Sequence, residues 1–210
     1  MTAEPLALVG LSVSGGLGPW AAAGFAVADD RLVIGRVLVR PADAGETRGI
    51  VAWSLSGVED GAVDGLLTVA PMVPDAPAPS HPNRTVAIDH LVVASPDLDR
   101  TTEALGAVGI ELRRVRDAGR MEQRFFRLGP LILELIGRPG DHGAGPAAFW
   151  GLALTVDDID ATAVLLGARL GPVTEAVQPG RRIATLRHEA LGIPVPIAVL
   201  SPPPPRPSPS

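Results

Sequence analysis

A histidine and a glutamate each stand inside an apolar segment of this 210-residue chain. His90 lies in IDHLVV and Glu134 lies in LILELIG, and both segments have the composition of β-strands that bury at least one face. A buried imidazole or carboxylate is costly unless it has a partner. Imidazole nitrogen and carboxylate oxygen are also good ligands for zinc, iron, manganese or nickel. We therefore predict that the two side chains meet, either as ligands of one divalent metal or as a metal-free acid–base pair.

Further polar residues are candidates for the same site. Two protein ligands hold a metal weakly, because catalytic zinc usually keeps three. The candidate third ligands are Gln123, on a segment predicted to form a hairpin with that of Glu134, and His188, near a turn. Arg182 follows a Pro-Gly turn and is a candidate, with Gln123, for binding the carboxylate or phosphate of a substrate. The residues fit one divalent metal or none equally well, and they leave open whether the chain is an enzyme.

The composition narrows the classes of partner. The formal net charge of −5 gives nucleic-acid binding no electrostatic support. There is no cysteine, which excludes disulfides and thiolate metal ligands. No apolar run approaches the ~18 residues that a membrane-spanning helix needs, and the N-terminus lacks the basic residues of a secretion signal. We expect a cytoplasmic protein whose partner is a small molecule, with no nucleic acid and no membrane.

Two proline-rich stretches divide the chain. Residues 73–84 are predicted to be a linker and residues 203–210 a disordered tail, because runs of proline cannot hold a regular element for long. The segment between them, 85–202, has the length of one compact domain. Residues 1–72 are predicted to form a separate N-terminal unit.

The segment 85–202 contains one pattern twice, at 86–138 and at 148–202. Each copy begins with an apolar strand, continues with an aspartate that can cap an amphipathic helix, and ends with three strand-like segments. The capping aspartates are Asp97 and Asp158. Each copy is therefore predicted to be a β-α-β-β-β unit.

Residues 1–72 follow the same order less clearly. We predict one degenerate β-α-β-β-β unit, whose helix covers 17–27. Its expected strands are 6–15, 31–40, 49–57 and 66–71. The predicted fold class is α+β, with two paired units and a degenerate third unit in front.

The repeated unit resembles a known superfamily. A strand with DHLVV, then PDLD and a helix, then a closing LELIG, resembles the vicinal oxygen chelate proteins, which include glyoxalases, bleomycin-resistance proteins and extradiol dioxygenases. The resemblance covers roughly residues 86–202. It implies paired βαβββ units that form a curved, cup-like mixed sheet with a divalent metal or small ligand inside. In metal-dependent members each unit supplies a His from its first strand and a Glu from its last, and these places hold His90 and Glu134 here.

The second copy departs from that pattern. Gly151 takes the place that corresponds to His90, and Ala198 the place that corresponds to Glu134. Two functions therefore remain open. One is a metal-dependent lyase, isomerase or dioxygenase that acts on a small oxygenated metabolite. The other is a metal-free protein that binds or sequesters a small molecule without turnover. Exposed strand edges also make a homodimer a reasonable expectation.

Overall fold

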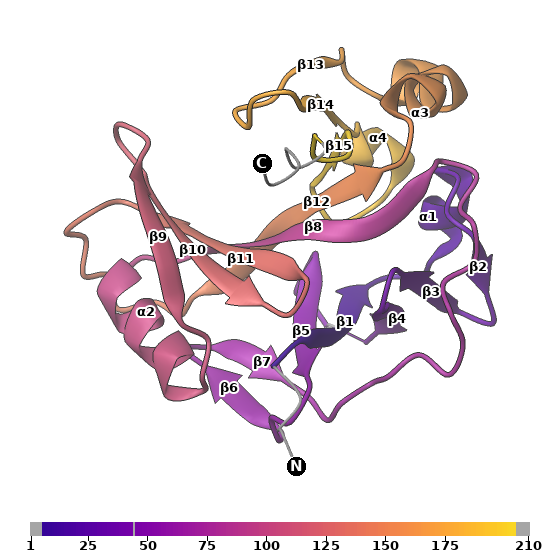
Figure 1. Cartoon of the computed structure of the whole chain (residues 1–210). Coiled ribbons are helices and arrows are strands. Elements are labelled where there is room, and N and C mark those ends of the chain that lie inside the picture. The colour runs from indigo at the N-terminus through magenta and orange to yellow at the C-terminus, as the bar shows by residue number, and fades with distance from the viewer. Residues whose placement is uncertain (1–5, 44, 205–210) are drawn as a thin grey trace, which may run out of the picture.

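The structure of the chain is a computed structural model that describes residues 6–43 and 45–204. It contains two mixed β-sheets, one of seven strands from the N-terminal part and one of eight strands from the rest (Figure 1). Within the described part, no helix has the length and apolar character needed to cross a membrane.

The eight-stranded sheet consists of two β-α-β-β-β units, as predicted. The first unit comprises β8 (Thr85–Ala94), α2 (Leu98–Ala107), β9 (Leu112–Asp117), β10 (Glu122–Leu128) and β11 (Leu131–Gly137). The second comprises β12 (Ala148–Val156), α3 (Ile159–Leu166), η1 (Gly167–Arg169), β13 (Thr174–Glu175), β14 (Arg182–Thr185), α4 (His188–Leu191) and β15 (Ile197–Leu200). The strand order is β13-β14-β15-β12-β8-β11-β10-β9. The two units therefore meet in the middle of the sheet, where the first strand of each, β8 and β12, pair antiparallel.

The two helices of these units begin where the sequence predicts. The Asp97 side chain accepts a hydrogen bond from the backbone nitrogen of Arg100 at 3.0 Å. The Asp158 side chain accepts hydrogen bonds from the backbone nitrogens of Asp160 and Ala161, each at 3.0 Å. Both carboxylates thereby satisfy amide groups that have no partner inside the helix.

The N-terminal sheet contains more than the single unit predicted for it. A complete unit is formed by β1 (Leu8–Ser14), α1 (Gly18–Ala22), β2 (Val27–Ala28), β3 (Arg31–Ile34) and β4 (Val37–Ala42). A shorter set without a helix follows, formed by β5 (Ile50–Leu55), β6 (Gly61–Val63) and β7 (Leu66–Thr68). The prediction treated residues 31–40 as one strand, whereas they form the hairpin β3–β4. The chain reverses at Gly35, which has a positive φ of 62°.

The seven-stranded sheet repeats the plan of the larger one. Its strand order is β2-β3-β4-β1-β5-β7-β6, and β1 pairs with β5 antiparallel, as β8 pairs with β12. The chain is therefore built from four related units arranged as two pairs, of which the second unit is reduced to three strands.

Period-two alternation decides which side chains of β11 face the core. Leu131, Leu133 and Leu135 are buried, at no more than 2% exposure, whereas Ile132 and Glu134 are half-buried on the other face. The leucines belong to a continuous apolar core that also contains residues of the N-terminal sheet. The alternate face of β11 is left to line the concave side of the sheet.

The two sheets pack against each other through apolar side chains. Figure 1 shows the indigo and purple N-terminal strands lying beneath β8, β11 and β12 in that view. The buried ring of Trp53, on β5, meets the ring of Phe149, on β12, at a centroid distance of 5.4 Å with an edge-on geometry. The chain therefore has one shared core and no solvent layer between separate domains at this point.

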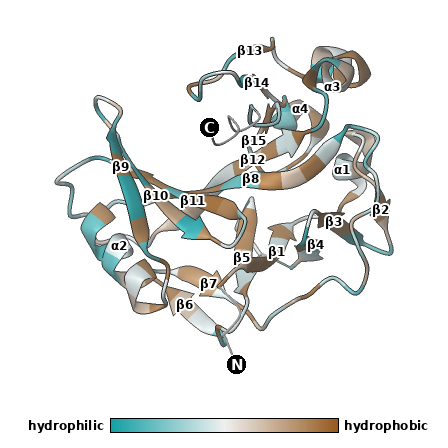
Figure 2. Ribbon diagram, viewed as in Figure 1, coloured by the Kyte–Doolittle hydropathy of each residue, from teal (hydrophilic) through white to brown (hydrophobic). Residues whose placement is uncertain are grey.

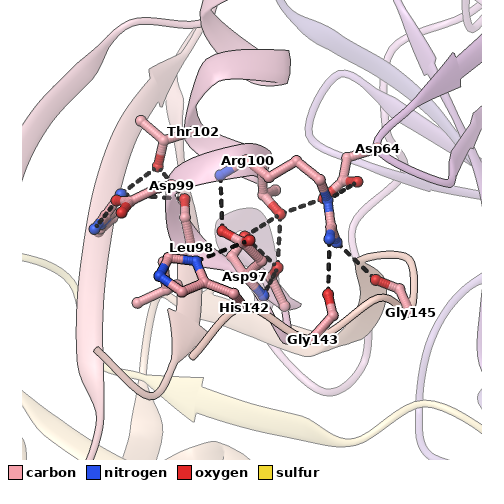
Figure 3. Close-up of polar contacts among 12 residues, drawn as sticks. Asp64, Asp97, Leu98, Asp99, Arg100, Thr102, His142, Gly143 and Gly145 are labelled. Atoms are coloured by element: carbon pink, nitrogen blue, oxygen red, sulfur yellow. Dashed lines mark hydrogen bonds and ion pairs between the residues drawn. The ribbon is translucent and has the colours of Figure 1, made fainter. Parts of the chain in front are cut away.

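A cluster of polar contacts joins the sheets at the N-terminus of α2 (Figure 3). Arg100 donates through Nε to Asp64 at 2.7 Å and through its NH groups to the carbonyl oxygens of Gly143 at 2.8 Å and Gly145 at 2.6 Å. Thr101 also donates to the Asp64 carboxylate. Asp64 lies in the turn between β6 and β7, so these bonds fix the N-terminal sheet to the second one.

The proline-rich segment predicted as a linker is anchored at its end. His81 is buried: Nδ1 accepts from the Ala26 amide at 3.1 Å, and Nε2 lies 2.9 Å from the Val33 carbonyl oxygen. Asn83 donates to the Ala23 carbonyl oxygen at 3.0 Å. Residues 205–210 of the predicted tail lie outside the described residues.

Candidate functional site

A cavity of about 810 Å³ lies inside the eight-stranded sheet. Strands of both units line it. Except for Gln178, the polar side chains on its wall come from the first unit, and the residues that the second unit contributes are mostly apolar. We call this cavity the cup.

The structure brings His90 and Glu134 to the wall of the cup. Parallel pairing of β8 with β11 sets His90 opposite Ile132 and Val92 opposite Glu134. His90 and Glu134 therefore share one face of the sheet and lie one two-residue step apart on adjacent strands. Both line the cup together with Gln123 from β10.

A β-bulge in β8 places a further carboxylate beside His90. The pairing with β12 runs from Ala153 opposite His90 directly to Leu154 opposite Ile88, so Asp89 is the extra residue. A bulge re-aims the side chain next to it. Asp89 Oδ1 consequently lies 2.7 Å from Nδ1 of His90, although neighbours in a regular strand point to opposite faces.

The contact with Asp89 fixes the hydrogen of the His90 ring on Nδ1, because a carboxylate accepts a hydrogen bond there. No described residue makes a hydrogen bond to Nε2 of His90. The lone pair of Nε2 is thus free to bind a metal or accept a proton. An imidazole held this way by a carboxylate is typical of both metal-ligating and general-base histidines.

Asp89 is itself held by a buried arginine. Arg181, only 3% exposed, donates to Asp89 Oδ2 at 2.6 Å, and Thr155 donates to the same oxygen at 2.7 Å. Burial alone would raise the pKa of Asp89. The hydrogen bonds from His90, Arg181 and Thr155 outweigh it and hold that pKa well below its usual range. Asp89 is therefore a fixed negative charge behind the imidazole.

Gln123 and Glu134 form the other polar part of the wall. Gln123 Nε2 donates to Glu134 Oε1 at 2.7 Å, while Oε1 of Gln123 is buried and has no hydrogen-bond partner. Burial raises the pKa of Glu134, and the nearby His90 and Arg116 and the Gln123 hydrogen bond only partly oppose this. The wall therefore offers an unpartnered amide oxygen and a carboxyl group that keeps its proton to higher pH than usual.

The structure does not bring Arg182 to the cup. Arg182 donates to Asp160 at 2.9 and 2.7 Å, on the outer face of the sheet beside α3. Pairing of Thr185 with Ala198 and of Phe125 with Glu134 makes Ile183 the equivalent of Gln123. The predicted alignment of Arg182 with Gln123 was wrong by one residue. A shift of one residue along a strand moves a side chain to the opposite face of the sheet.

His188 is also remote from the cup. Its Nδ1 lies 3.0 Å from the Ile193 carbonyl oxygen, within the turn that α4 forms. This leaves Gln123 as the predicted third ligand that stands beside Glu134.

The second unit provides a mostly apolar wall. The helix caps Asp97 and Asp158 correspond, and by the same register Gly151 corresponds to His90. The pairing of Ala153 with Ala198 likewise matches that of Val92 with Glu134. The cup is lined on this side by the apolar residues Ala153, Ala176, Val177, Pro179, Ile183 and Leu200 and by Gln178.

Two kinds of residue in the site escaped the sequence analysis. Asp89 and Arg181 were missed because a bulge, which breaks the period of two, brings Asp89 round to His90. Arg114, Arg116 and Arg127 line the cup as well. The density of arginine in residues 113–127 was a visible signal for them.

The donor set on the polar wall fits a divalent metal. It consists of the unpaired Nε2 of His90, the Glu134 carboxylate and the orphaned Oε1 of Gln123. One nitrogen and two oxygen ligands suit zinc, iron, manganese or nickel. Among the described residues there is no group of three or more His, Cys, Asp or Glu that could hold a metal, so the amide oxygen is needed as the third ligand.

Comparison with known proteins gives matches in structure alone. No family model matches the sequence, and no curated protein matches it. A solved structure of catechol 2,3-dioxygenase is similar over 97% of this chain and 91% of its own, with 13% identity and a TM-score of 0.61. The Mn(II)-bound glyoxalase from Novosphingobium aromaticivorans is similar over 94% and 81%, with 16% identity and a TM-score of 0.56.

A mutant of 4-hydroxymandelate synthase from Streptomyces coelicolor is similar over 94% of this chain and 84% of its own, with 17% identity and a TM-score of 0.53. All three likenesses extend over both sheets of the chain. Together with the strand order, they show that the chain has the same fold as these proteins, the paired βαβββ architecture that the sequence resemblance implied.

Proposed function

We propose that the cup is the site where the chain binds a small oxygenated metabolite and acts on it as a glyoxalase-like enzyme, with His90, Gln123 and Glu134 around the reacting oxygens. One observation carries the proposal: Asp89 binds Nδ1 of His90 and leaves Nε2 unpaired, on a residue that lines the cup next to Glu134 and Gln123. The proposal includes a divalent metal, held by Nε2 of His90, the Glu134 carboxylate and Oε1 of Gln123.

The side chains of the cup provide acid–base chemistry of their own. Without a metal, Nε2 of His90 is placed to take a proton from a ligand, and Glu134, whose pKa is raised by burial, is suited to donate a proton to a ligand oxygen. A bound divalent metal would instead occupy Nε2 and the Glu134 carboxylate and would supply Lewis-acid polarisation of that oxygen. Lyase and isomerase reactions can use either arrangement, and a dioxygenase reaction would need a redox-active metal such as iron or manganese.

The test is the metal content of the chain purified without chelator, for wild type, His90→Ala and Glu134→Ala. We expect about one divalent metal per chain in wild type and a large loss in both variants, because each would leave two ligands. His188→Ala is the matched control, since His188 lies outside the cup. If wild type contains little metal and both variants contain the same small amount, the metal is no longer part of the proposal.

A second candidate function is metal-free binding or sequestration of a small molecule. The apolar wall favours it, because glycine and alanine stand where the second unit would supply a matching histidine and carboxylate. Ligand binding that persists in EDTA without turnover would select this function. Binding or turnover that EDTA abolishes would select the first.

A further inference from the structure

Arginine is concentrated on one side of the cup. The chain has 18 arginines and no lysine, and six of the arginines fall within residues 113–127. Four of these six line the cup: Arg113, Arg114, Arg116 and Arg127. Among the described residues, Glu134 is the only acidic one that lines the cup. In a chain with a net charge of −5, this is a local excess of positive charge.

The register of the edge strand explains why these arginines face the cup. On β9, Arg114 stands opposite Phe125 and Arg116 opposite Gln123, and both of those β10 residues line the cup. Side chains of cross-strand partners lie on the same face, so both arginine side chains project from that face, from backbone positions about 7 Å apart along the strand. Figure 2 shows β9 as a strongly hydrophilic strand at the side of the sheet.

The cup-facing arginines differ from a structural arginine of the same hairpin. Arg124 points to the other face, where it donates to Glu122 and Asp99, each at 2.7 Å. Among the described residues no ion pair or hydrogen bond is made by the side chains of Arg114, Arg116 or Arg127. Charges on an edge strand also discourage pairing with other sheets, but that role needs neither one sign of charge nor a common face.

The wall across the cup is mostly apolar, with Gln178 as a polar exception. Ala153, Ile183 and Leu200 line it, and the ring of Phe125 lies between them and the arginines in the sheet order. A ligand that satisfies both sides has an apolar body and an anionic group at one end. Guanidinium groups bind carboxylate and phosphate oxygens through paired, charge-assisted hydrogen bonds.

We propose that the ligand of the cup is an amphiphilic anion, whose carboxylate or phosphate is bound by Arg114 and Arg116 and whose apolar body lies on the wall formed by the second unit. Arg127 adds positive charge at the same side. The inference rests on the proposed function in using the same cup, and it adds the chemical class of the ligand.

The test uses two fluorescent probes of similar shape. One is 8-anilinonaphthalene-1-sulfonate, an aromatic anion, and the other is its neutral counterpart, N-phenyl-1-naphthylamine. We expect wild type to bind the anion more tightly than the neutral probe. The variant Arg114→Gln/Arg116→Gln should raise the Kd of the anion about tenfold or more and leave that of the neutral probe within about twofold.

A matched control removes the same charge elsewhere. Arg120 and Arg138 are exposed and do not line the cup, so R120Q/R138Q should leave both Kd values unchanged. Displacement of the sulfonate by 1-naphthaleneacetate, by 1-naphthyl phosphate and by neutral 1-naphthaleneacetamide then distinguishes a carboxylate ligand from a phosphate ligand. A wild type that binds the anion no better than the neutral probe overturns the inference, and so does an equal loss in R120Q/R138Q.

Failure of this inference is separable from failure of the proposed function. His90→Ala/Glu134→Ala keeps all the arginines and should still bind the sulfonate. If Arg114→Gln/Arg116→Gln does not affect sulfonate binding while His90→Ala and Glu134→Ala abolish metal binding, the ligand class is wrong and the function stands. If Arg114→Gln/Arg116→Gln weakens sulfonate binding while His90→Ala and Glu134→Ala do not affect metal content, the ligand class is supported and the metal is not.

Discussion

Asp89 determines which ring nitrogen of His90 carries the hydrogen. A free imidazole exchanges its hydrogen between two nitrogens, and a carboxylate at 2.7 Å from Nδ1 removes that freedom. The carboxylate is in turn held by Arg181, whose side chain is 4% exposed. A chain of polar contacts thus runs from the buried Arg181 through Asp89 to His90 on the wall of the cup.

We predict that Asp89→Asn costs about 3–5 kcal/mol of the free energy of unfolding, because it leaves the buried Arg181 without a counter-charge. The variant also weakens the preference of His90 for carrying its hydrogen on Nδ1. Urea denaturation measures the first effect, and the NMR shifts of the imidazole nitrogens measure the second.

A double-mutant cycle gives the control for this prediction. Arg181→Gln alone leaves Asp89 short of one partner, and the double variant Asp89→Asn/Arg181→Gln removes both charges. We expect the double variant to be clearly more stable than the sum of the single losses implies. Simple additivity of the two losses would show that the two side chains do not act as an ion pair.

At the scale of the elements, regular periodicity was predictable and its interruptions were not. The apolar composition of residues 88–93 and 131–137 predicted the two strands that carry His90 and Glu134, and the aspartates at 97 and 158 predicted both helix starts. The bulge at Asp89 depends on pairing with β12, which lies over 60 residues away in the sequence. The one-residue error at Arg182 has the same origin, because register is set by the partner strand.

The segment between the sheets contains a titratable anchor. Burial lowers the pKa of His81 below its usual 6.5, although the bond to the Val33 carbonyl opposes this. Near pH 6 the unfolded chain therefore binds more protons at this residue than the folded chain does. The contribution of His81 to stability is complete above pH 6.5 and declines as the pH falls below it.

We predict that His81→Gln lowers the free energy of unfolding by about 1–3 kcal/mol at pH 7.5, because the Ala26 amide loses its buried acceptor. The variant should also flatten the decline in stability between pH 7 and pH 5. Denaturant titrations of wild type and variant across that range measure both effects. Parallel pH profiles for the two proteins would contradict a buried, neutral His81.

At the scale of the whole molecule, the two sheets share one core. Trp53 packs on Phe149, and a Cβ on Gly65 would come within 2.2 Å of Pro146, so the surfaces fit closely. The Asp64–Arg100 pair lies at the same junction (Figure 3). The N-terminal units therefore act as the support of the sheet that forms the cup.

We predict that a fragment of residues 85–204 does not fold to a stable monomer, because removal of the first sheet exposes the apolar face that carries Phe149 and Leu133. Size-exclusion chromatography and near-UV circular dichroism of the fragment are the measurements. A monomeric fragment that unfolds cooperatively would show that the eight-stranded sheet is independent of the first.

The unlike walls of the cup have a stereochemical consequence. The β8–β12 pair relates the two units by an approximate two-fold axis, and a cup lined alike on both sides would accept a ligand in either of two directions. With histidine and carboxyl on one side and alanine, isoleucine and leucine on the other, a single direction of entry is favoured. A prochiral substrate would then present the same face to Nε2 of His90 in every turnover, which makes the handedness of any product a property of this asymmetry.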